Sequence, residues 1–250
     1  MSARTIVLQA EKITKSYNGR TIIQDISITL ERGELVCLLG VSGAGKTTLF
    51  HVLSGLEPPN CGRVLLEGED VTSTPGKISY MLQHDLLLPH KKVIDNVALP
   101  LNLQGKKLRE ARETALSYFS QFGLDGTQNQ YPAQLSGGMR QRAALLRTFL
   151  GSRGVVLLDE PFSALDALTK RELHRWYLDM IGQLGLSTLL VTHDIDEAVL
   201  LSDRIFILSG QPGHITAQLP IRSQRPRTID FALSEEFLGY KKQILSLLDA

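Results

Sequence analysis

The most informative stretch of this 250-residue chain for its fold is Gly40-Val41-Ser42-Gly43-Ala44-Gly45-Lys46-Thr47. It fits the phosphate-loop pattern, in which a glycine, four residues and a second glycine precede Lys and then Ser or Thr. Glycines let the backbone turn tightly, so several N–H groups converge on one point, and a following helix adds its positive dipole end. The loop stands between a predicted strand, 35–39, and a helix predicted from Lys46, the context in which such a loop binds a nucleotide. An ordinary glycine-rich turn is the alternative.

We expect this loop to bind ATP and Mg²⁺. Lys46 supplies a mobile positive charge for the β- and γ-phosphates, and the Thr47 hydroxyl is placed to ligate Mg²⁺. The loop residues predicted to contact ATP are Gly40, Ser42, Gly43, Ala44, Gly45, Lys46, Thr47 and Thr48.

A second candidate site follows the apolar run 155–158, which ends in Asp159 and Glu160. A strand here would bring Asp159 to the sheet edge near the phosphate loop, where it can hold Mg²⁺ through water. Glu160, one residue further, can face the γ-phosphate and accept a proton from the attacking water. Paired carboxylates also occur as solvated strand ends, which is the alternative.

The rest of the chain predicts an α/β fold with a phosphate-loop core. Short apolar runs typical of parallel strands buried on both faces occur at 35–39, 155–158, 188–192 and 205–208. Segments with helical spacing lie between them, at 46–54, 108–122, 139–150, 168–183 and 194–201. This alternation predicts a doubly wound parallel sheet with its chemistry at the carboxyl ends of the strands.

The flanking regions differ from this core. Short β-prone segments at 6–13, 22–30, 63–66 and 77–81 predict an antiparallel sheet leaning on it. Residues from about 85 to 150 read as a helical subdomain. We therefore expect one domain over 1–222, and a short tail, 223–250, with a helix at 234–248.

Composition narrows the class of protein. The net charge is +1, from 27 basic and 26 acidic residues, which argues against nucleic acid held by bulk electrostatics. No apolar stretch approaches the roughly 18 residues that a membrane span requires, and the start, Met1-Ser2-Ala3-Arg4, lacks a signal peptide's apolar region. Cys37 and Cys61 are expected to be reduced core thiols.

The most specific motif is Leu135-Ser136-Gly137-Gly138-Met139-Arg140-Gln141-Arg142. Ser136 and two glycines open a helix, which makes a second anion site from exposed N–H groups, a hydroxyl and a dipole end. A Ser N-cap on an ordinary helix would explain Ser136, but not the paired glycines. The stretch resembles the signature sequence of ATP-binding-cassette ATPases.

This resemblance covers roughly residues 5 to 220 and implies further roles. Two such domains pair head to tail, and the signature residues Ser136, Gly137, Gly138 and Met139 of one copy cap the ATP of the other. The remaining positions follow in order: Tyr17 to stack on adenine, Gln83 to touch Mg²⁺ and the attacking water, Asp166 in the loop Ser163-Ala164-Leu165-Asp166 that crosses the dimer interface, and His193 to contact the γ-phosphate. A turn tyrosine and an ordinary strand-end histidine are the alternatives for Tyr17 and His193.

The apolar loop His84-Asp85-Leu86-Leu87-Leu88-Pro89-His90 suggests a partner surface, which in the family is the groove for a membrane permease. Packing within the helical subdomain is its alternative. Three features resemble bacterial importers of the nitrate, sulfonate and taurine type, a branch that includes importers of thiamine-related pyrimidines. They are Leu87-Leu88-Pro89 followed by Val93-Ile94-Asp95-Asn96-Val97, the signature ending Met139-Arg140-Gln141-Arg142, and the late Gln211-Pro212-Gly213-His214-Ile215 with Arg225-Pro226-Arg227. His90 and His214 depart from that branch, where tryptophan and arginine are expected.

The resemblance then implies a peripheral ATPase at the cytoplasmic face of the inner membrane, working with a permease and an extracytoplasmic solute-binding protein. An exporter subunit, a soluble cassette ATPase acting on DNA or the ribosome, and a non-catalytic nucleotide-binding scaffold remain as alternatives.

Overall fold

The computed structural model describes residues 5–163, 165–225 and 227–248, and its centre is a six-stranded sheet in the order β10-β9-β3-β8-β7-β6. The strands are β3 (Leu35–Gly40), β6 (Ser79–Met81), β7 (Val155–Asp159), β8 (Ser187–Thr192), β9 (Arg204–Ser209) and β10 (His214–Pro220). All neighbours pair in parallel except β10, which runs antiparallel to β9. Strands β3, β7 and β8 are buried along their whole length, which explains their unbroken apolar runs.

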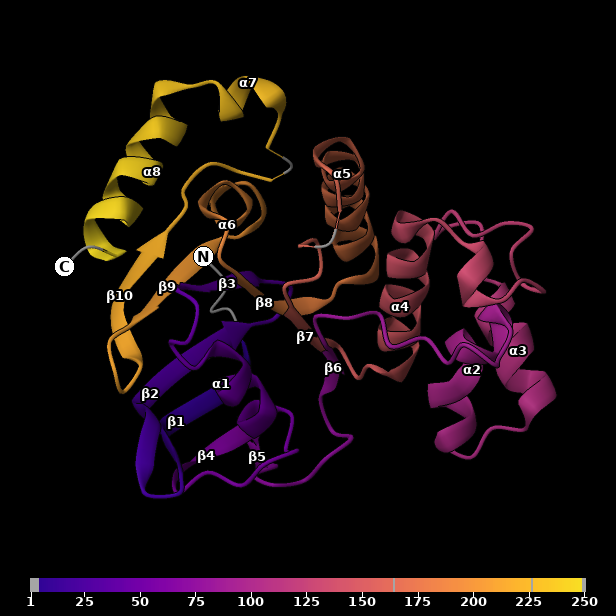
Figure 1. Ribbon diagram of the computed structural model, residues 1–250, viewed down its shortest axis with the longest axis horizontal. Helices are drawn as coiled ribbons and strands as arrows, with labels where there is room; N and C mark the ends of the chain where they lie inside the picture. Colours follow the sequence, from indigo (N-terminus) through magenta and orange to yellow (C-terminus); the bar gives the residue numbers. More distant parts are fainter. Residues whose placement is uncertain (1–4, 164, 226, 249–250) are drawn as a thin grey trace.

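A four-stranded antiparallel sheet lies below this core (Figure 1). Its strands are β1 (Ile6–Tyr17), β2 (Arg20–Glu31), β4 (Cys61–Leu66) and β5 (Glu69–Asp70). Strands β1 and β2 are joined by Asn18 and Gly19, whose φ angles of 49° and 78° suit the tight turn of a hairpin. Cys61, the first residue of β4, is exposed, so its expected place in the core was wrong, whereas Cys37 is buried.

One strand was assigned to the wrong sheet. Residues 77–81 were expected in the antiparallel sheet, but β6 pairs in parallel with β7, with Tyr80 opposite Leu157. A strand of only three residues carries too little pattern to show its partner, so the choice of sheet depends on which edge the chain reaches.

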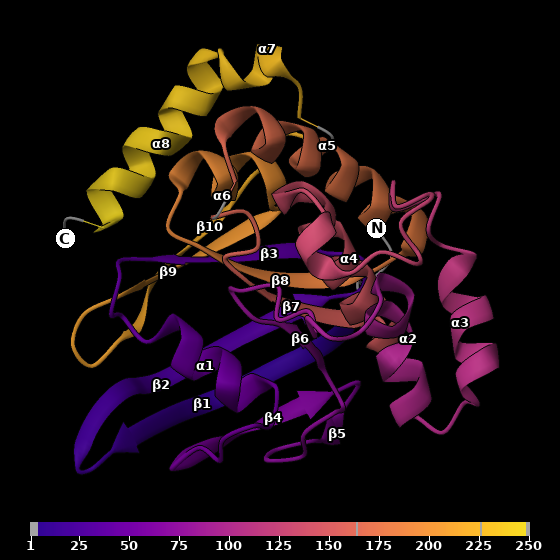
Figure 2. The same ribbon diagram turned by 45° about the vertical axis from the view of Figure 1, so that its right-hand side comes forward.

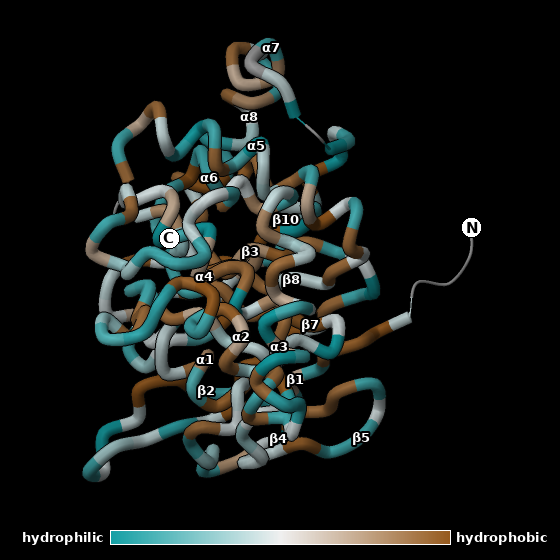
Figure 3. The backbone as a smooth tube through the Cα atoms, turned by 90° about the vertical axis from the view of Figure 1, so that its right-hand side faces the viewer, coloured by the Kyte–Doolittle hydropathy of each residue, from teal (hydrophilic) through white to brown (hydrophobic). Residues whose placement is uncertain are grey.

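Helices cover both faces of the parallel sheet. On one face α1 (Lys46–Leu53) packs with the antiparallel sheet, and on the other lie α5 (Ala167–Leu184) and α6 (Ile195–Leu201) (Figure 1). Alternate side chains of each strand point to opposite faces of the sheet. In β3, Val36 and Leu38 pack toward α1, while Leu35 packs toward α5. The apolar stretches therefore run through the middle of the molecule (Figure 3).

A helical lobe stands beside the sheet (Figures 1 and 2). It contains α2 (Val93–Leu103), α3 (Leu108–Leu116), the 3₁₀ turn η1 (Pro132–Gln134) and α4 (Gly137–Gly151). The helix expected over 108–122 ends at Leu116, and turns take the chain on to Phe122, whose ring is buried in the core. In the parts of the chain that the structure describes, no helix has both the length and the apolar composition needed to span a bilayer.

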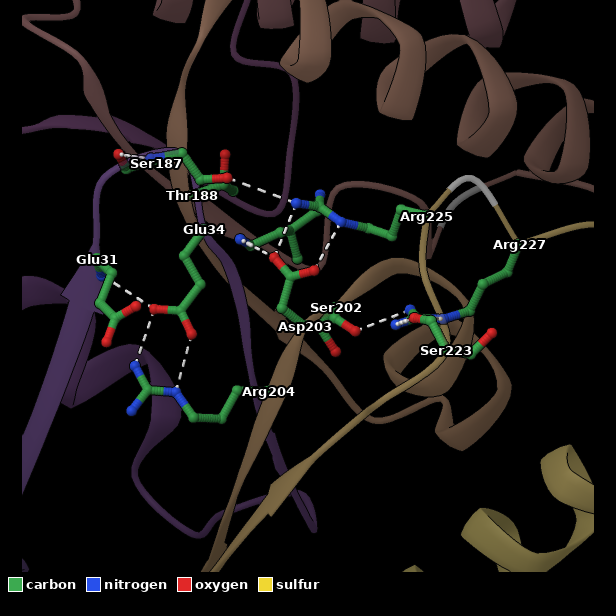
Figure 4. Close-up of polar contacts among 12 residues, drawn as sticks. Glu31, Glu34, Ser187, Thr188, Ser202, Asp203, Arg204, Ser223, Arg225 and Arg227 are labelled. Atoms are coloured by element: carbon green, nitrogen blue, oxygen red, sulfur yellow. Dashed lines mark hydrogen bonds and ion pairs between the residues drawn. The ribbon is translucent and has the colours of Figure 1, made fainter. Parts of the chain in front are cut away.

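The tail contains α7 (Ile229–Ala232) and α8 (Glu235–Leu248), in agreement with the predicted final helix. Arg225 binds both carboxylate oxygens of Asp203 at the start of β9, at 2.7 and 2.8 Å (Figure 4). Phe237 and Ile244 of α8 are buried in a cluster with residues of α6 and β9. The tail is thus packed on the same side of the sheet as α6.

Candidate active site

The phosphate loop connects the buried end of β3 to the start of α1. Gly43 and Gly45 have φ angles of 83° and 97°, a left-handed conformation that residues with a side chain rarely adopt. Gly45 caps α1, and Val41, Ser42 and Gly43 are exposed above it. The first N–H groups of α1 lack partners within the helix, so this exposed rim can hold an anion.

Gly45 also has no room for a side chain. A Cβ at this position would lie 2.4 Å from Ile23 Cγ2. We expect Gly45→Ala to lower the free energy of unfolding by about 3 kcal/mol through backbone strain and overpacking, measured by chemical denaturation. Gly43→Ala is the matched control, because it bears a similar φ but meets nothing within 4 Å. Equal losses in the two variants would contradict the steric argument.

The Lys46 side chain folds back over the loop. Its Nζ donates to the carbonyl oxygens of Gly40 and Val41 at 2.9 and 3.0 Å, and the residue is only 7% exposed. Burial lowers the pKa of Lys46, although the carboxylates of Glu160 and Asp159 act in the opposite direction. The ammonium group thus lies against the backbone of the loop between β3 and α1.

Asp159, the last residue of β7, lies beside the start of α1. One carboxylate oxygen accepts hydrogen bonds from the Thr47 hydroxyl at 3.0 Å and from the Tyr80 hydroxyl at 3.1 Å. Burial raises the pKa of Asp159, and these two donors partly offset the effect. Sequence reasoning missed Tyr80, because its place here depends on the pairing of β6 with β7.

Glu160 is the meeting point of two other predicted residues. Its Oε2 atom lies 3.3 Å from Gln83 Nε2, which donates to it, and 3.1 Å from His193 Nδ1. Its φ angle is 47°, in the left-handed region, and its N–H donates to Val191 O at 2.9 Å. A non-glycine residue held in this conformation is strained, and such residues are concentrated at functional sites.

These side chains lie at the carboxyl ends of neighbouring strands: Lys46 after β3, Gln83 after β6, Glu160 after β7 and His193 after β8. They line one cleft of about 490 Å³ together with Ser42, Gly43, Gly45, Thr47, Thr48 and Asp159. Gly40 and Ala44 lie beneath it and are buried. The cleft has the size of a small-ligand site and lies where an open α/β sheet binds its ligand.

Tyr17 lies outside the residues that line this cleft. Its hydroxyl donates to the Glu57 carboxylate, and Lys15 Nζ is 4.9 Å from the centre of its ring. Burial and the Glu57 carboxylate raise its pKa to about 12, while a contact with Thr48 partly opposes them. Tyr17 is 38% exposed, so part of this residue remains open to solvent.

The signature residues also lie away from the cleft, on the helical lobe (Figure 2). Ser136 caps α4, and its hydroxyl oxygen accepts a hydrogen bond from Met139 N at 3.2 Å. Asp166 caps α5 by accepting from Leu168 N and Thr169 N, each at 3.1 Å. Ala164, in the loop before Asp166, is outside the described residues.

Comparison with known proteins decides the family. Residues 23–163, more than half of the chain, match the family described as ABC transporter. The chain belongs to the ABC transporter family. The resemblance predicted from the signature sequence is therefore confirmed, and the chain is an ATP-binding cassette.

Curated relatives of this ABC cassette align over most of their length. The formylaminopyrimidine import ATP-binding protein ThiZ of Halalkalibacterium halodurans is 43% identical, over 97% of this chain and 96% of that protein. The nitrate import protein NrtD of Synechocystis is 38% identical, over 90% and 87%. The taurine import protein TauB of Escherichia coli O157:H7 is 37% identical, over 88% and 86%.

Solved structures share the fold of the cassette. An ATP-binding cassette solved as a dimer in a post-hydrolysis state, bound to ADP and Pi, is 26% identical with a TM-score of 0.75. The match covers 87% of this chain and all of that one. The protein cbiO1 of Clostridium perfringens, part of the ABC transporter complex cbiONQ, has the same fold, with a TM-score of 0.79 and 23% identity over 96% of this chain.

Proposed function

We propose that the chain is the ATP-hydrolysing subunit of a bacterial importer for a small solute. The observation that carries this is the convergence of Lys46, Gln83, Glu160 and His193 on one cleft beside the phosphate loop. The curated relatives named above are import ATP-binding proteins, which supports the direction of transport.

In this proposal ATP and Mg²⁺ occupy the cleft. The Thr47 hydroxyl and the Asp159 carboxylate lie 3.0 Å apart, and such oxygen donors suit Mg²⁺, which neutralises phosphate charge when bound. Lys46 binds the β- and γ-phosphates. Glu160 orients the attacking water and takes its proton, while Gln83 and His193 hold the Glu160 carboxylate in place.

The signature is proposed to act on a second copy. Ser136, Gly137 and Gly138 open α4 away from the chain's own cleft, so they can reach a nucleotide only on another molecule. Solved relatives form dimers. Head-to-tail pairing would give two sites, each with one phosphate loop and one signature, and Asp166 would lie between them.

A permease is the proposed partner of the loop after Gln83. Leu86 is 54% exposed with a φ angle of 43°, whereas Leu87 is buried in the core. Arg147 of α4 fixes the loop by donating to the carbonyl oxygens of Asp85 and Leu86. An exposed leucine on a fixed loop next to an active-site glutamine is suited to carry a partner's movement into the cleft.

The proposed substrate class is a nitrate, sulfonate, taurine or thiamine-pyrimidine type solute, delivered by an extracytoplasmic binding protein. The chain would act at the cytoplasmic face of the inner membrane. His90 and His214 stand where that branch is expected to have tryptophan and arginine.

Purification of the tagged chain from native membranes in mild detergent tests this proposal. We expect a multi-span permease to copurify, and Leu86→Asp to reduce its recovery at least about tenfold, because a buried unpaired charge costs several kcal/mol. Leu233→Asp is the control, since Leu233 is 78% exposed on the tail. Recovery of ribosomes or DNA would favour a soluble cassette ATPase, and a permease without any binding protein would favour an exporter.

A further inference from the structure

A second groove, of about 480 Å³, lies between α5, α6 and residues 227–232 of the tail. It is separate from the nucleotide cleft and shares none of its lining residues. In Figures 1 and 2 the start of the tail passes beside α5 and α6. Its volume falls in the range of small-molecule sites.

Guanidinium groups dominate the charge of this groove. Arg171 and Arg175, one turn apart on α5, are exposed and make no hydrogen bond or ion pair within the described residues. Arg227 adds a third positive charge from the tail. Asp179 and Asp230 also line the groove, so its lining contains three arginines and two carboxylates.

Arg227 is partly buried, unlike the two exposed arginines of α5. Its N–H groups donate to the carbonyl oxygens of Ser223, Ser202, Val199 and Leu200, and no carboxylate within the described part of the chain forms an ion pair with it (Figure 4). Asp203, the acidic neighbour with the largest influence on it, is already bound by Arg225. Burial lowers the pKa of Arg227 to about 10. Neutral carbonyls satisfy its hydrogen bonds but leave its charge free to attract an anion.

The remaining wall of the groove is apolar, formed by Leu178, Leu200 and Leu201. A ligand that fits both surfaces has an anionic head for the arginines and a short hydrocarbon group for the leucines. Sulfonates and carboxylates have such heads, and guanidinium groups bind them in a bidentate manner.

The groove also touches a chain of contacts that leads to the active site. His174 lines it and places Nε2 3.1 Å from Glu197 Oε1. Glu197 is 3% exposed, and its other oxygen accepts a hydrogen bond from the hydroxyl of Thr192, the residue before His193. Lys170 of α5 holds the same carboxylate at 3.3 Å.

We propose that this groove binds a small organic anion and that its occupancy is linked to nucleotide binding through His174 and Glu197. A ligand that joins the arginines of α5 to Arg227 of the tail fixes the distance between α5 and α6. Glu197 lies on α6 and contacts His174 of α5, so a change in this distance moves Glu197. Thr192 donates to Glu197, and the shift therefore reaches the neighbouring His193. The linkage rests on the proposed function, whereas the binding site does not.

Calorimetric titration of the full chain with hexane-1-sulfonate tests the site, with ADP saturating the nucleotide cleft. We expect saturable binding that Arg175→Glu weakens at least about tenfold, because it replaces attraction by repulsion at an exposed position. Arg153→Glu is the matched control, being an exposed arginine outside the groove. Methanesulfonate should bind more weakly than hexane-1-sulfonate, and hexylammonium should not bind.

Absence of saturable binding, or equal binding by wild type and Arg175→Glu, would overturn the site. For the linkage, ATP affinity is measured with and without saturating hexane-1-sulfonate, and a change of about fivefold is expected, in the range of typical coupling energies. An unchanged ATP affinity despite binding would overturn the linkage and leave the site. Failure of the chain to bind ATP at all would instead count against the proposed function.

Discussion

Glu160→Gln is expected to abolish steady-state ATP turnover while ATP binding is retained. The amide has nearly the shape of the carboxylate and can still meet Gln83 and His193, which lie 3.3 and 3.1 Å from Glu160 Oε2. It cannot accept the proton of the attacking water, and loss of a general base typically costs about 10²–10⁴-fold in rate. Removing a negative charge near the γ-phosphate also removes repulsion, so ATP affinity should be equal or higher.

The variant should also accumulate a closed dimer with ATP, because the nucleotide that bridges the two copies is no longer consumed. Phosphate release measures turnover, and sedimentation with ATP measures the dimer. Glu172→Gln is the matched control, since Glu172 is exposed on α5 and outside the cleft. Turnover near the wild-type rate in Glu160→Gln would refute Glu160 as the base.

Lys46→Ala is expected to weaken ATP binding itself. The Nζ group lies against the carbonyls of Gly40 and Val41, in the loop that we propose binds the phosphates. Losing a charged hydrogen-bond partner costs about 1.5–3 kcal/mol, which corresponds to roughly 10- to 150-fold in affinity. Removal of the ammonium also leaves those two carbonyls without this donor, so some loss of stability is expected in the absence of ligand.

Titration with a fluorescent ATP analogue measures the affinity, and chemical denaturation without nucleotide shows how much of the effect is loss of folded protein. Lys242→Ala serves as the control, because Lys242 is an exposed lysine of α8. An unchanged nucleotide affinity in folded Lys46→Ala would mean that the loop does not bind phosphate in the proposed way.

Much of the fold could be predicted from the sequence because local signals agreed with it. The buried strands β3, β7 and β8 are continuous apolar runs, and α5 and α6 begin at Asp166 and Asp194, whose side chains cap them. Where such signals are weak, prediction failed: the three residues of β6 were given to the wrong sheet, and exposed Cys61 was placed in the core.

The candidate site was predictable in its residue types and order, but not in its contacts. Glu160 contacts both Gln83 and His193, and Asp159 accepts hydrogen bonds from both Tyr80 and Thr47. These contacts depend on strands that are far apart in sequence and adjacent in the sheet. The predicted roles of the cleft residues, of Tyr17 and Asp166 and of the signature residues all stay predictions, since each depends on a ligand or a second copy.

The phosphate loop, the signature and the family could be predicted from the amino-acid sequence alone, because short motifs with fixed backbone requirements carry their chemistry locally. The side chains that contact the Glu160 carboxylate, and the sheet that β6 joins, became known from the packing of the folded chain. That packing also revealed the groove between α5, α6 and the tail. Arg175 and Arg227 are 52 positions apart, and nothing in the pattern around either residue predicts that they line the same groove. Such contacts are set by how the elements pack, which local periodicity does not encode.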